Sequence, residues 1–429
     1  MLDIKSGNIS LIGYGVSNRA LCNYFLGKGI CPSVRCPQEC TLPKGVTGIF
    51  GDGYFNTYEK TVFRSPGVRP DLIIGECEIY TEIGYALEKA PSFKIGVTGS
   101  DGKTTTSTLI YRMLMQGGKN AFLGGNVGAP LIGIAEKMCA DDFVVAELSS
   151  FQLFDCAPAL DIAVVTNITE NHLDWHKDMG EYISAKKNIL KNAKRAVLNY
   201  DDPTVRGFAC ERTTYFSLQD CTDKLNCGFD FVHIVNGQVC YNEKVLFPAS
   251  VICLHGEFNV QNVLCAVGCV YPIVGAPPAL RVAKEFCGVD NRMQIIDTVN
   301  GVTFVNSVID STPSRTVKTL SAFPLGRVTC ILGGYDKNLS YECLKDTLSK
   351  VKAVVLCGEN KDKISACVSR HTIKVNTLKE AVLAAYKSAS RGDYVILSPA
   401  SASFDMFKNY KEKAGCFKEL VKGLKNGEY

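Results

Sequence analysis

The chain lacks the features that would place it in a membrane or outside the cell. It has no uninterrupted apolar run of about 20 residues, the length that a membrane-spanning helix needs. The segment after Met1 does not resemble a signal peptide, because its apolar run is short and leads directly into a glycine turn. We therefore expect a cytoplasmic protein with no membrane partner.

Charge and cysteine pattern argue against two further classes. The formal net charge is only +4 and no dense run of lysine and arginine occurs, so no nucleic-acid partner is expected. The chain has 20 cysteines but no Cys-x-x-Cys pair, and the closest group (Cys31, Cys36 and Cys40) has no common zinc spacing. We interpret the cysteines as free, largely buried thiols of a reducing compartment.

What the chain does have is a repeated alternation of short apolar runs and helical stretches over 429 residues, too many for one ordinary domain. We predict an α/β protein with domains at 1–92, 93–289 and 290–429. The first and third domains are expected to be Rossmann-like, and the central one to hold a mostly parallel sheet. Only 213–254 alternates short strands with tight turns, which predicts an antiparallel hairpin patch. The predicted strands lie at 9–12, 61–64, 94–97, 143–146, 162–166, 196–199, 302–305, 328–332, 353–356 and 394–397.

The strongest local signal is a glycine-rich loop of P-loop type between a predicted strand and a predicted helix. Residues 96–105 read Gly-Val-Thr-Gly-Ser-Asp-Gly-Lys-Thr-Thr. Glycines let backbone N–H groups approach phosphate oxygens, the helix N-terminus adds its positive dipole end, and Lys103 adds a full charge. Thr104 can bind a magnesium ion that bridges two phosphates. The glycine spacing differs from the general P-loop pattern, which argues against a motor or GTPase. The expected ATP contacts in this loop are Gly99, Ser100, Asp101, Gly102, Lys103, Thr104 and Thr105.

Polar side chains follow the neighbouring strands of the same domain. Ligands of parallel sheets collect beyond the carboxyl ends of the strands. Glu147, which follows the strand at 143–146, is therefore a candidate magnesium ligand, and His172 is a candidate second ligand. Asn126 lies in a glycine turn and can contact phosphate or substrate. Lys186, taken alone, would be a solvated lysine on a helix.

The order and approximate spacing of these motifs resemble the Mur ligase family, essentially along the whole chain. The phosphate loop, Glu147-Leu-Ser-Ser, the segment from Asn167 to His172 and the helix with Lys186 occur in the family's order. The resemblance implies one domain for a UDP-sugar substrate, one for ATP and one for an amino acid. It also implies two Mg²⁺ ions and a carbamylated Lys186. The implied catalytic residues are Lys103, Glu147, His172 and Lys186, and the implied metal ligands are Thr104, Glu147, His172 and Lys186.

The third domain resembles the branch of the family that adds D-glutamate. Residues 332–337 close one predicted strand there, and residues 398–410 follow another. The cation of Lys337 and the hydroxyls of Ser401 and Ser403 suit a dicarboxylic amino acid. The resemblance implies D-glutamate contacts at Ser311, Lys337, Ser403, Phe404 and Tyr410.

The same resemblance implies contacts for the other two substrates. In the first domain, Tyr14-Gly15-Val16-Ser17 and Ser65-Pro66-Gly67 match the family's UDP-binding loops. The implied contacts of the UDP substrate are Gly15, Val16, Ser17, Ser65, Pro66, Gly67 and Asn126. Further ATP contacts are implied at Asn259, Asn262 and Arg292.

The implied activity is ATP-dependent addition of D-glutamate to UDP-N-acetylmuramoyl-L-alanine through an acyl phosphate, by a monomer, in peptidoglycan precursor synthesis. Some positions depart from the family pattern. Ser307 and Val308 stand where relatives usually carry Asp-Ser, Phe258 and Asn291 where histidines are common, and Arg35-Cys36 where an acidic residue is frequent. Two alternatives stay open: a ligase of this family with a different amino acid, and a catalytically silent nucleotide-binding homologue.

Overall fold

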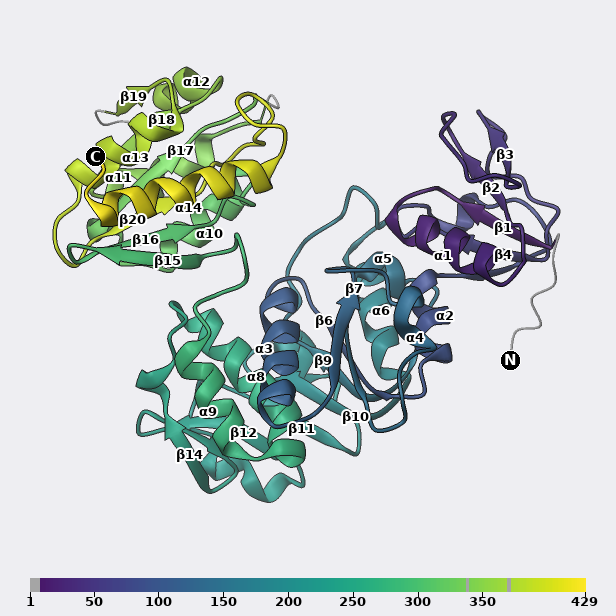
Figure 1. Ribbon diagram of the computed structural model, residues 1–429. Helices are drawn as coiled ribbons and strands as arrows, with labels where there is room; N and C mark the ends of the chain where they lie inside the picture. The colour runs from purple at the N-terminus through teal and green to yellow at the C-terminus, as the bar shows by residue number, and fades with distance from the viewer. Residues whose placement is uncertain (1–7, 337–338, 369–371) are drawn as a thin grey trace. The chain divides into compact units, whose positions relative to one another are not determined.

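The computed structural model describes residues 8–336, 339–368 and 372–429 (Figure 1). The described chain forms three sheets with helices on their faces, so the predicted α/β class is confirmed. It divides into two compact units.

Unit 1 holds the first two sheets, and unit 2 holds the third. Unit 1 is discontinuous, because the chain leaves it after Ile252, returns at Phe258 and leaves again after Lys284. Unit 2 takes up the short stretch Cys253–Glu257 and everything from Glu285 onward. Two thiols of unit 2, Cys253 and Cys287, lie 3.2 Å apart at these crossings.

The first sheet has five parallel strands in the order β3-β2-β1-β4-β5. Its central strands are largely buried on both faces because helices cover the sheet. Its elements are β1 (Ile9–Ile12), α1 (Val16–Gly27), β2 (Ser33–Cys36), β3 (Thr47–Phe50), β4 (Thr61–Arg64), β5 (Glu78–Tyr80) and α2 (Glu82–Lys89).

The second sheet has nine strands in the order β14-β13-β12-β11-β10-β9-β6-β8-β7. Its strands are β6 (Phe93–Thr98), β7 (Ala121–Gly125), β8 (Phe143–Glu147), β9 (Ala159–Val165), β10 (Asn192–Asn199), β11 (Thr213–Phe216), β12 (Asp230–Val235), β13 (Gln238–Tyr241) and β14 (Lys244–Pro248). Its helices are α3 (Lys103–Gln116), α4 (Ile132–Ala135), α5 (Ser150–Leu153), α6 (Met179–Lys187), α7 (Pro203–Arg206), α8 (Glu257–Val274) and α9 (Ala276–Glu285).

The predicted hairpin patch at 213–254 is only partly right. Strands β12, β13 and β14 pair in antiparallel fashion, but β11 pairs in parallel with both β10 and β12. The parallel region therefore runs from β7 to β12. It brings the carboxyl ends of β6, β8, β9 and β10 to one edge of the sheet.

Helix α8 is the one helix among the described residues that is long and apolar enough to cross a membrane. Its side chains from Val263 to Val270 are buried in the structure. Burial of this kind is typical of a core helix, which meets the same criteria of length and composition.

The third sheet has the order β15-β16-β20-β17-β18-β19, with β15 antiparallel to β16 and the other pairs parallel. Buried clusters lie on both of its faces, one around Phe304 and Phe417 and one around Leu332 and Leu344. Its elements are β15 (Gln294–Val299), β16 (Val302–Asn306), α10 (Pro313–Ser321), β17 (Val328–Leu332), α11 (Lys345–Lys350), β18 (Ala353–Cys357), α12 (Lys361–Cys367), β19 (Ile373–Val375), α13 (Leu378–Ser388), β20 (Tyr394–Leu397) and α14 (Tyr410–Asn426).

Candidate active site

The glycine-rich loop leaves β6 and enters α3 in a backbone shape that two glycines make possible. Gly99 has φ +148°, and a Cβ there would lie 1.9 Å from Thr166 Oγ1. Gly102 has φ +80°, and a Cβ there would lie 2.4 Å from Asn262 Oδ1. Both the conformation and the close approach of neighbours require glycine. The loop is thereby fixed against the end of β9 and against α8.

The N-terminus of α3 has the character of an anion site. Its N-cap is Gly102, so no side chain caps the first N–H groups of this 14-residue helix. Lys103 Nζ donates to the carbonyl oxygens of Gly99 (2.8 Å) and Ser100 (3.0 Å), which holds the ammonium over the loop. Thr104 is buried beside it, and the backbone N–H of Asp101 donates to Asn167 Oδ1 at 2.9 Å. Phosphate oxygens fit this arrangement of donors.

Lys186 on α6 is buried, unlike the solvated lysine that its position in the sequence would suggest by default. Its side chain is 1% exposed, and its Nζ donates to the Gly99 carbonyl at 2.7 Å and lies 4.8 Å from the Tyr182 ring centre. Burial, and then the nearby charge of Lys103, hold the pKa of this amine well below its usual value. The sheet thus brings Lys186 beside the phosphate loop.

Glu147 ends β8 on the same edge and is 1% exposed. Its Oε1 accepts a hydrogen bond from Asn126 Nδ2 at 2.9 Å, whereas its Oε2 is buried with no hydrogen-bond partner in the described part of the chain. A buried carboxylate oxygen without a partner is unfavourable unless a cation or donor meets it. Together with the Thr104 hydroxyl, this oxygen is the donor type that Mg²⁺ prefers, so the residues present fit that ion.

His172 differs from the other predicted metal ligands. It is exposed, has φ +57°, and its ring packs 4.8 Å from the ring of Phe151. Within the described ranges, no three or more His, Cys, Asp or Glu side chains gather into a metal cluster. A magnesium ion here would therefore depend on hydroxyl and phosphate oxygens as well as on Glu147.

The two predicted UDP-binding loops lie side by side at the carboxyl ends of β1 and β4. The Asn18 side chain is buried and donates to the carbonyls of Ile12 (3.2 Å), Gly13 (2.8 Å) and Phe63 (3.0 Å). This amide stands at the position of the missing third glycine and ties the two strand ends together. Ser65 Oγ is buried without a partner among the described residues, and a Cβ on Gly13 would lie 2.9 Å from it.

Gly15, Val16 and Ser17 form the start of α1. Gly15 is the N-cap, so this helix also begins without a side-chain cap. The first domain therefore offers a second helix N-terminus beside an unpaired hydroxyl. Arg35, near the end of β2, bonds other residues of the first domain: its guanidinium donates to Glu59 at 2.9 Å and to Ser10 Oγ at 3.0 Å.

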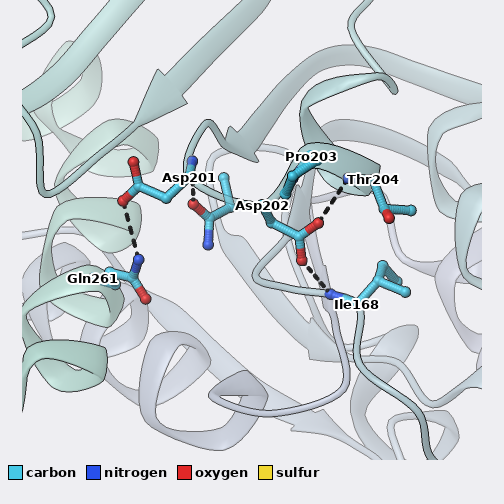
Figure 2. A pocket seen from close by; sticks show the side chains of 7 residues that line it. Ile168, Asp201, Asp202, Pro203, Thr204 and Gln261 are labelled. Carbon is cyan, nitrogen blue, oxygen red and sulfur yellow. Dashed lines mark hydrogen bonds between the residues drawn. The ribbon is translucent and has the colours of Figure 1, made fainter.

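An open pocket of about 370 Å³ lies beyond β9 and β10, against α8 (Figure 2). Its two adjacent carboxylates are both engaged. Asp201 accepts from Ser217 Oγ, the Leu218 N–H and Gln261 Nε2, and Asp202 accepts from the Ile168, Thr204 and Val205 N–H groups. These bonds hold both carboxylates in the wall of the pocket. The lining residues are Ile168, Asn199, Asp201, Asp202, Pro203, Thr204 and Gln261.

Asn259 and Asn262 of α8 lie on the phosphate-loop side of that helix. Asn262 Oδ1 accepts from Thr106 Oγ1 at 3.1 Å, and its Nδ2 donates to Asn259 Oδ1 at 3.1 Å. These two predicted ATP contacts thus lie in unit 1, together with the phosphate loop. Arg292, the remaining predicted ATP contact outside the loop, lies in unit 2.

The predicted amino-acid contacts all belong to unit 2. Ser403 is buried, Ser311 is half-buried, and Phe404 and Tyr410 are exposed. Lys337 lies outside the described residues. The sequence assigns no role to two neighbours of this region, because Lys413 lies outside the motifs and Asp405, although inside 398–410, has no distinguishing pattern there. Lys413 Nζ is buried and donates to the Gly333 carbonyl at 3.0 Å, and Asp405 Oδ1 is buried without a partner among the described residues.

Apart from Arg35 and Cys36, which are buried in unit 1, the positions that depart from the family pattern have structural roles in unit 2 or lie at the surface. Val308 is buried in the core, and Ser307 Oγ accepts from the Met293 N–H at 3.2 Å. Asn291 has φ +65° and accepts from Asn306 Nδ2 at 3.0 Å. Phe258 is exposed.

Comparison with known proteins agrees with this geometry. The model of the Mur ligase middle domain matches residues 97–270, and that of the Mur ligase, glutamate ligase domain matches residues 291–401. The chain is 38% identical to the UDP-N-acetylmuramoylalanine–D-glutamate ligase of Acetivibrio thermocellus, over 98% of this chain and 97% of that protein. It is 37% identical to the protein of the same name from Clostridium kluyveri, over 98% of both chains.

Solved structures show the same fold at low sequence identity. The UDP-N-acetylmuramate–alanine ligase of Thermotoga maritima superposes with a TM-score of 0.57 at 20% identity, over 97% of this chain and 99% of that one. A UDP-N-acetylmuramoyl-L-alanyl-D-glutamate–2,6-diaminopimelate ligase gives 0.59 at 18% identity, over 99% and 93%. The chain belongs to the Mur ligase family.

Proposed function

We propose that this protein is an ADP-forming ligase that joins D-glutamate to UDP-N-acetylmuramoyl-L-alanine in cytoplasmic peptidoglycan precursor synthesis. The observation that carries the proposal is the end-to-end similarity to relatives named for this activity. The phosphate loop, with Lys103 above it and Glu147 and Lys186 beside it, supports the use of ATP.

In the proposed reaction, the loop N–H groups and Lys103 hold the phosphates of ATP and neutralise the charge that develops during transfer. The carboxylate of the UDP substrate attacks the γ-phosphorus, which gives an acyl phosphate and ADP. The amine of D-glutamate then attacks the acyl carbon and loses a proton, and inorganic phosphate leaves. The dry, buried positions of Glu147 and Lys186 suit an intermediate that water would hydrolyse.

The metal and the modified lysine are part of the same proposal. Thr104 and Glu147 would hold one Mg²⁺, and His172 with a carbamate on Lys186 would hold a second. Bound Mg²⁺ supplies positive charge to the phosphate oxygens. A carbamate forms when a neutral amine attacks CO₂ and releases a proton, and the buried Lys186 has a lowered pKa that favours the neutral amine. Carbon-13-labelled bicarbonate should give a carbamate signal that a Lys186→Ala protein lacks.

We assign the substrates to domains as the sequence predicts. Residues 1–92 would bind the UDP substrate, 93–289 ATP and 290–429 D-glutamate. The Ser65 hydroxyl, which has no partner within the described ranges and lies beside the Gly13 turn, supports the first assignment. The second is supported by the fixed loop at Gly99 and Gly102. We propose that the protein works as a monomer, with Ser311, Lys337, Ser403, Phe404 and Tyr410 around D-glutamate and Arg292 on the ATP phosphates.

The test is a phosphate-release assay with ATP, Mg²⁺ and UDP-N-acetylmuramoyl-L-alanine against D-glutamate, L-glutamate, L-lysine and D-alanine, with product mass measured. We expect release and a product heavier by one glutamate residue with D-glutamate only. Turnover with another amine would identify a different ligase of the family, and no turnover despite ATP binding would identify a silent homologue. Lys103→Ala should lower turnover on the order of a hundredfold or more, and full turnover of that variant would refute the assignment of the loop.

A further inference from the structure

The loop Ser65-Pro66-Gly67 is held by side chains that bond its carbonyl oxygens. The Arg64 side chain is fully buried, and its Nη1 donates to the carbonyls of Pro66 (3.2 Å) and Val68 (3.0 Å). Trp175 Nε1 donates to the Gly67 carbonyl at 3.0 Å. Three successive carbonyls are therefore occupied, while Ser65 Oγ is left without a partner among the described residues. The backbone N–H groups of Ser65 and Val68 are already bonded and Pro66 has none, so the Ser65 hydroxyl is the side-chain group that the loop can offer to a ligand.

Further bonds of Arg64, like the Trp175–Gly67 bond, reach across from the first domain to the second sheet's domain within unit 1. Arg64 Nε donates to Asp155 Oδ2 at 2.7 Å, and its Nη2 donates to the Phe151 carbonyl at 2.6 Å. Trp175 itself belongs to the segment between His172 and α6. The loop is thus connected to the two segments that carry Glu147 and Lys186.

Arg69 fixes Trp175 in this arrangement. Its Nη1 donates to the Trp175 carbonyl at 2.6 Å, and the guanidinium lies 4.9 Å from the centre of the indole ring. Its Nη1 and Nη2 also donate to the Glu181 carboxylate of α6 at 3.1 and 3.2 Å. Phe154 packs edge-on against the indole at 5.3 Å. The indole has little freedom, so its N–H points at the Gly67 carbonyl as a fixed donor.

We propose that Trp175 and Arg69 are positioning residues for the UDP substrate: from the second sheet's domain, they hold the Ser65–Gly67 loop in the shape that receives the uridine diphosphate. This inference rests on the proposed function. It assigns a role in substrate binding to two residues that do not touch the substrate. A bond that only stabilised the fold would leave the ratio of the affinities for the UDP substrate and for ATP unchanged.

Trp175→Phe removes the indole N–H and keeps an aromatic ring over Arg69. We expect KM for UDP-N-acetylmuramoyl-L-alanine to rise several-fold, up to about tenfold, which corresponds to the loss of one hydrogen bond that holds the loop. KM for ATP and kcat should stay within about twofold. Arg69→Gln should raise the same KM at least as much, and Arg69→Lys should restore part of it.

Lys28→Gln is the matched control. Lys28 Nζ pairs with Glu136 at 2.6 Å and also connects the first domain to the second, but both side chains are exposed and neither contacts the loop. Its KM values should equal those of the unmodified chain. An equal rise in Lys28→Gln would overturn the inference, because the effect would then follow from domain docking in general.

Calorimetric titration of the full chain with UDP-N-acetylmuramoyl-L-alanine separates this inference from the proposed function. Trp175 is the chain's one tryptophan, so its emission should shift when that substrate binds. If the unmodified chain binds the substrate but turns over with no amine, the proposed function fails while a weaker affinity of Trp175→Phe still supports the positioning role. If Trp175→Phe binds and turns over with unchanged constants, the positioning role is wrong.

Discussion

Two buried lysines, one in each unit, make the same contact at the end of a parallel strand. Lys186 on α6 donates to the carbonyl of Gly99 after β6, and Lys413 on α14 donates to the carbonyl of Gly333 after β17. Both glycines have positive φ, +148° and +111°. In both places a Cβ on the glycine would collide with a neighbouring atom, so the backbone is tightly packed at the strand end. The lysine ammonium bonds the glycine carbonyl there.

The surroundings of the two amines differ. Burial lowers the pKa of Lys186, and the charge of Lys103 lowers it further, while the charges of Asp101 and Glu147 oppose the shift. Lys413 also has a pKa lowered by burial, but the charges nearest to it, led by Asp405, oppose that shift. Two amines close together are typical of a site that binds anions. A buried amine that faces a carboxylate is more typical of a structural contact. We infer that the Lys186 contact serves the chemistry in unit 1, whereas the Lys413 contact attaches the last helix in unit 2.

The largest expected effect comes from removing each amine. Lys186→Ala should lower turnover on the order of a hundredfold or more. It should cost less stability than Lys413→Ala, because the Gly99 carbonyl keeps its bond from Lys103. Lys413→Ala should destabilise unit 2 by about 1–3 kcal/mol, because the buried Gly333 carbonyl loses its donor. Phosphate release measures the first. Chemical unfolding followed by circular dichroism measures the second, with Trp175 emission reporting unit 1 alone. Full turnover of Lys186→Ala would remove the distinction between the two lysines.

A smaller effect is expected from the amide that orients Glu147. Asn126→Ala removes the 2.9 Å bond to Glu147 Oε1 and should lower turnover or Mg²⁺ affinity by about 10–100-fold. The matched control is Asn120→Ala, which removes a similar 2.8 Å bond to Asp142 at the other end of these strands. That variant should keep its turnover. Equal losses in both variants would show that Asn126 acts through stability only.

The pH dependence of stability offers a finer test. The folded-state pKa of Lys413 lies below its unfolded value, so in the range between them the unfolded chain binds more protons. The free energy of unfolding should therefore rise with pH through that range. Lys413→Met should flatten this rise in urea unfolding of unit 2 between neutral pH and about 10. Lys350→Met, at an exposed lysine of α11, should leave the slope as it is.

The smallest effect is expected at Tyr182, whose ring contacts Lys186 and whose hydroxyl lies 2.8 Å from Ser100 Oγ. Tyr182→Phe keeps the ring and removes one hydrogen bond, which should cost about 1 kcal/mol of stability. Turnover should change less than about tenfold, far less than for Lys186→Ala. A loss in turnover as large as that of Lys186→Ala would mean that the hydroxyl takes part in the chemistry.

Local patterns in the sequence were sufficient for much of unit 1. Apolar runs predicted β1 and β4 with their observed bounds, and glycine spacing predicted the loop that the structure fixes at Gly99 and Gly102. The burial of Lys186 could not be deduced from α6 alone. It depends on a contact 87 residues away, which no local spacing records.

Contacts of still longer range were missed altogether. The Trp175–Gly67 bond joins residues 108 apart, and Lys413 stands in a charged run at the start of α14 with nothing to mark it as buried. The error at β11 has a similar cause. Thr213–Phe216 is a four-residue strand of β-branched and aromatic residues, which suits a hairpin as well as the parallel place that it takes beside β10.

The return of the chain to unit 1 at Phe258 sets an order of assembly during synthesis. Asn262 of α8 packs against Gly102 and accepts from Thr106, a residue 156 positions earlier. The phosphate loop therefore leaves the ribosome long before the helix that completes it. At usual elongation speeds this interval is on the order of ten seconds. During that time the nascent loop lacks the packing contact with α8.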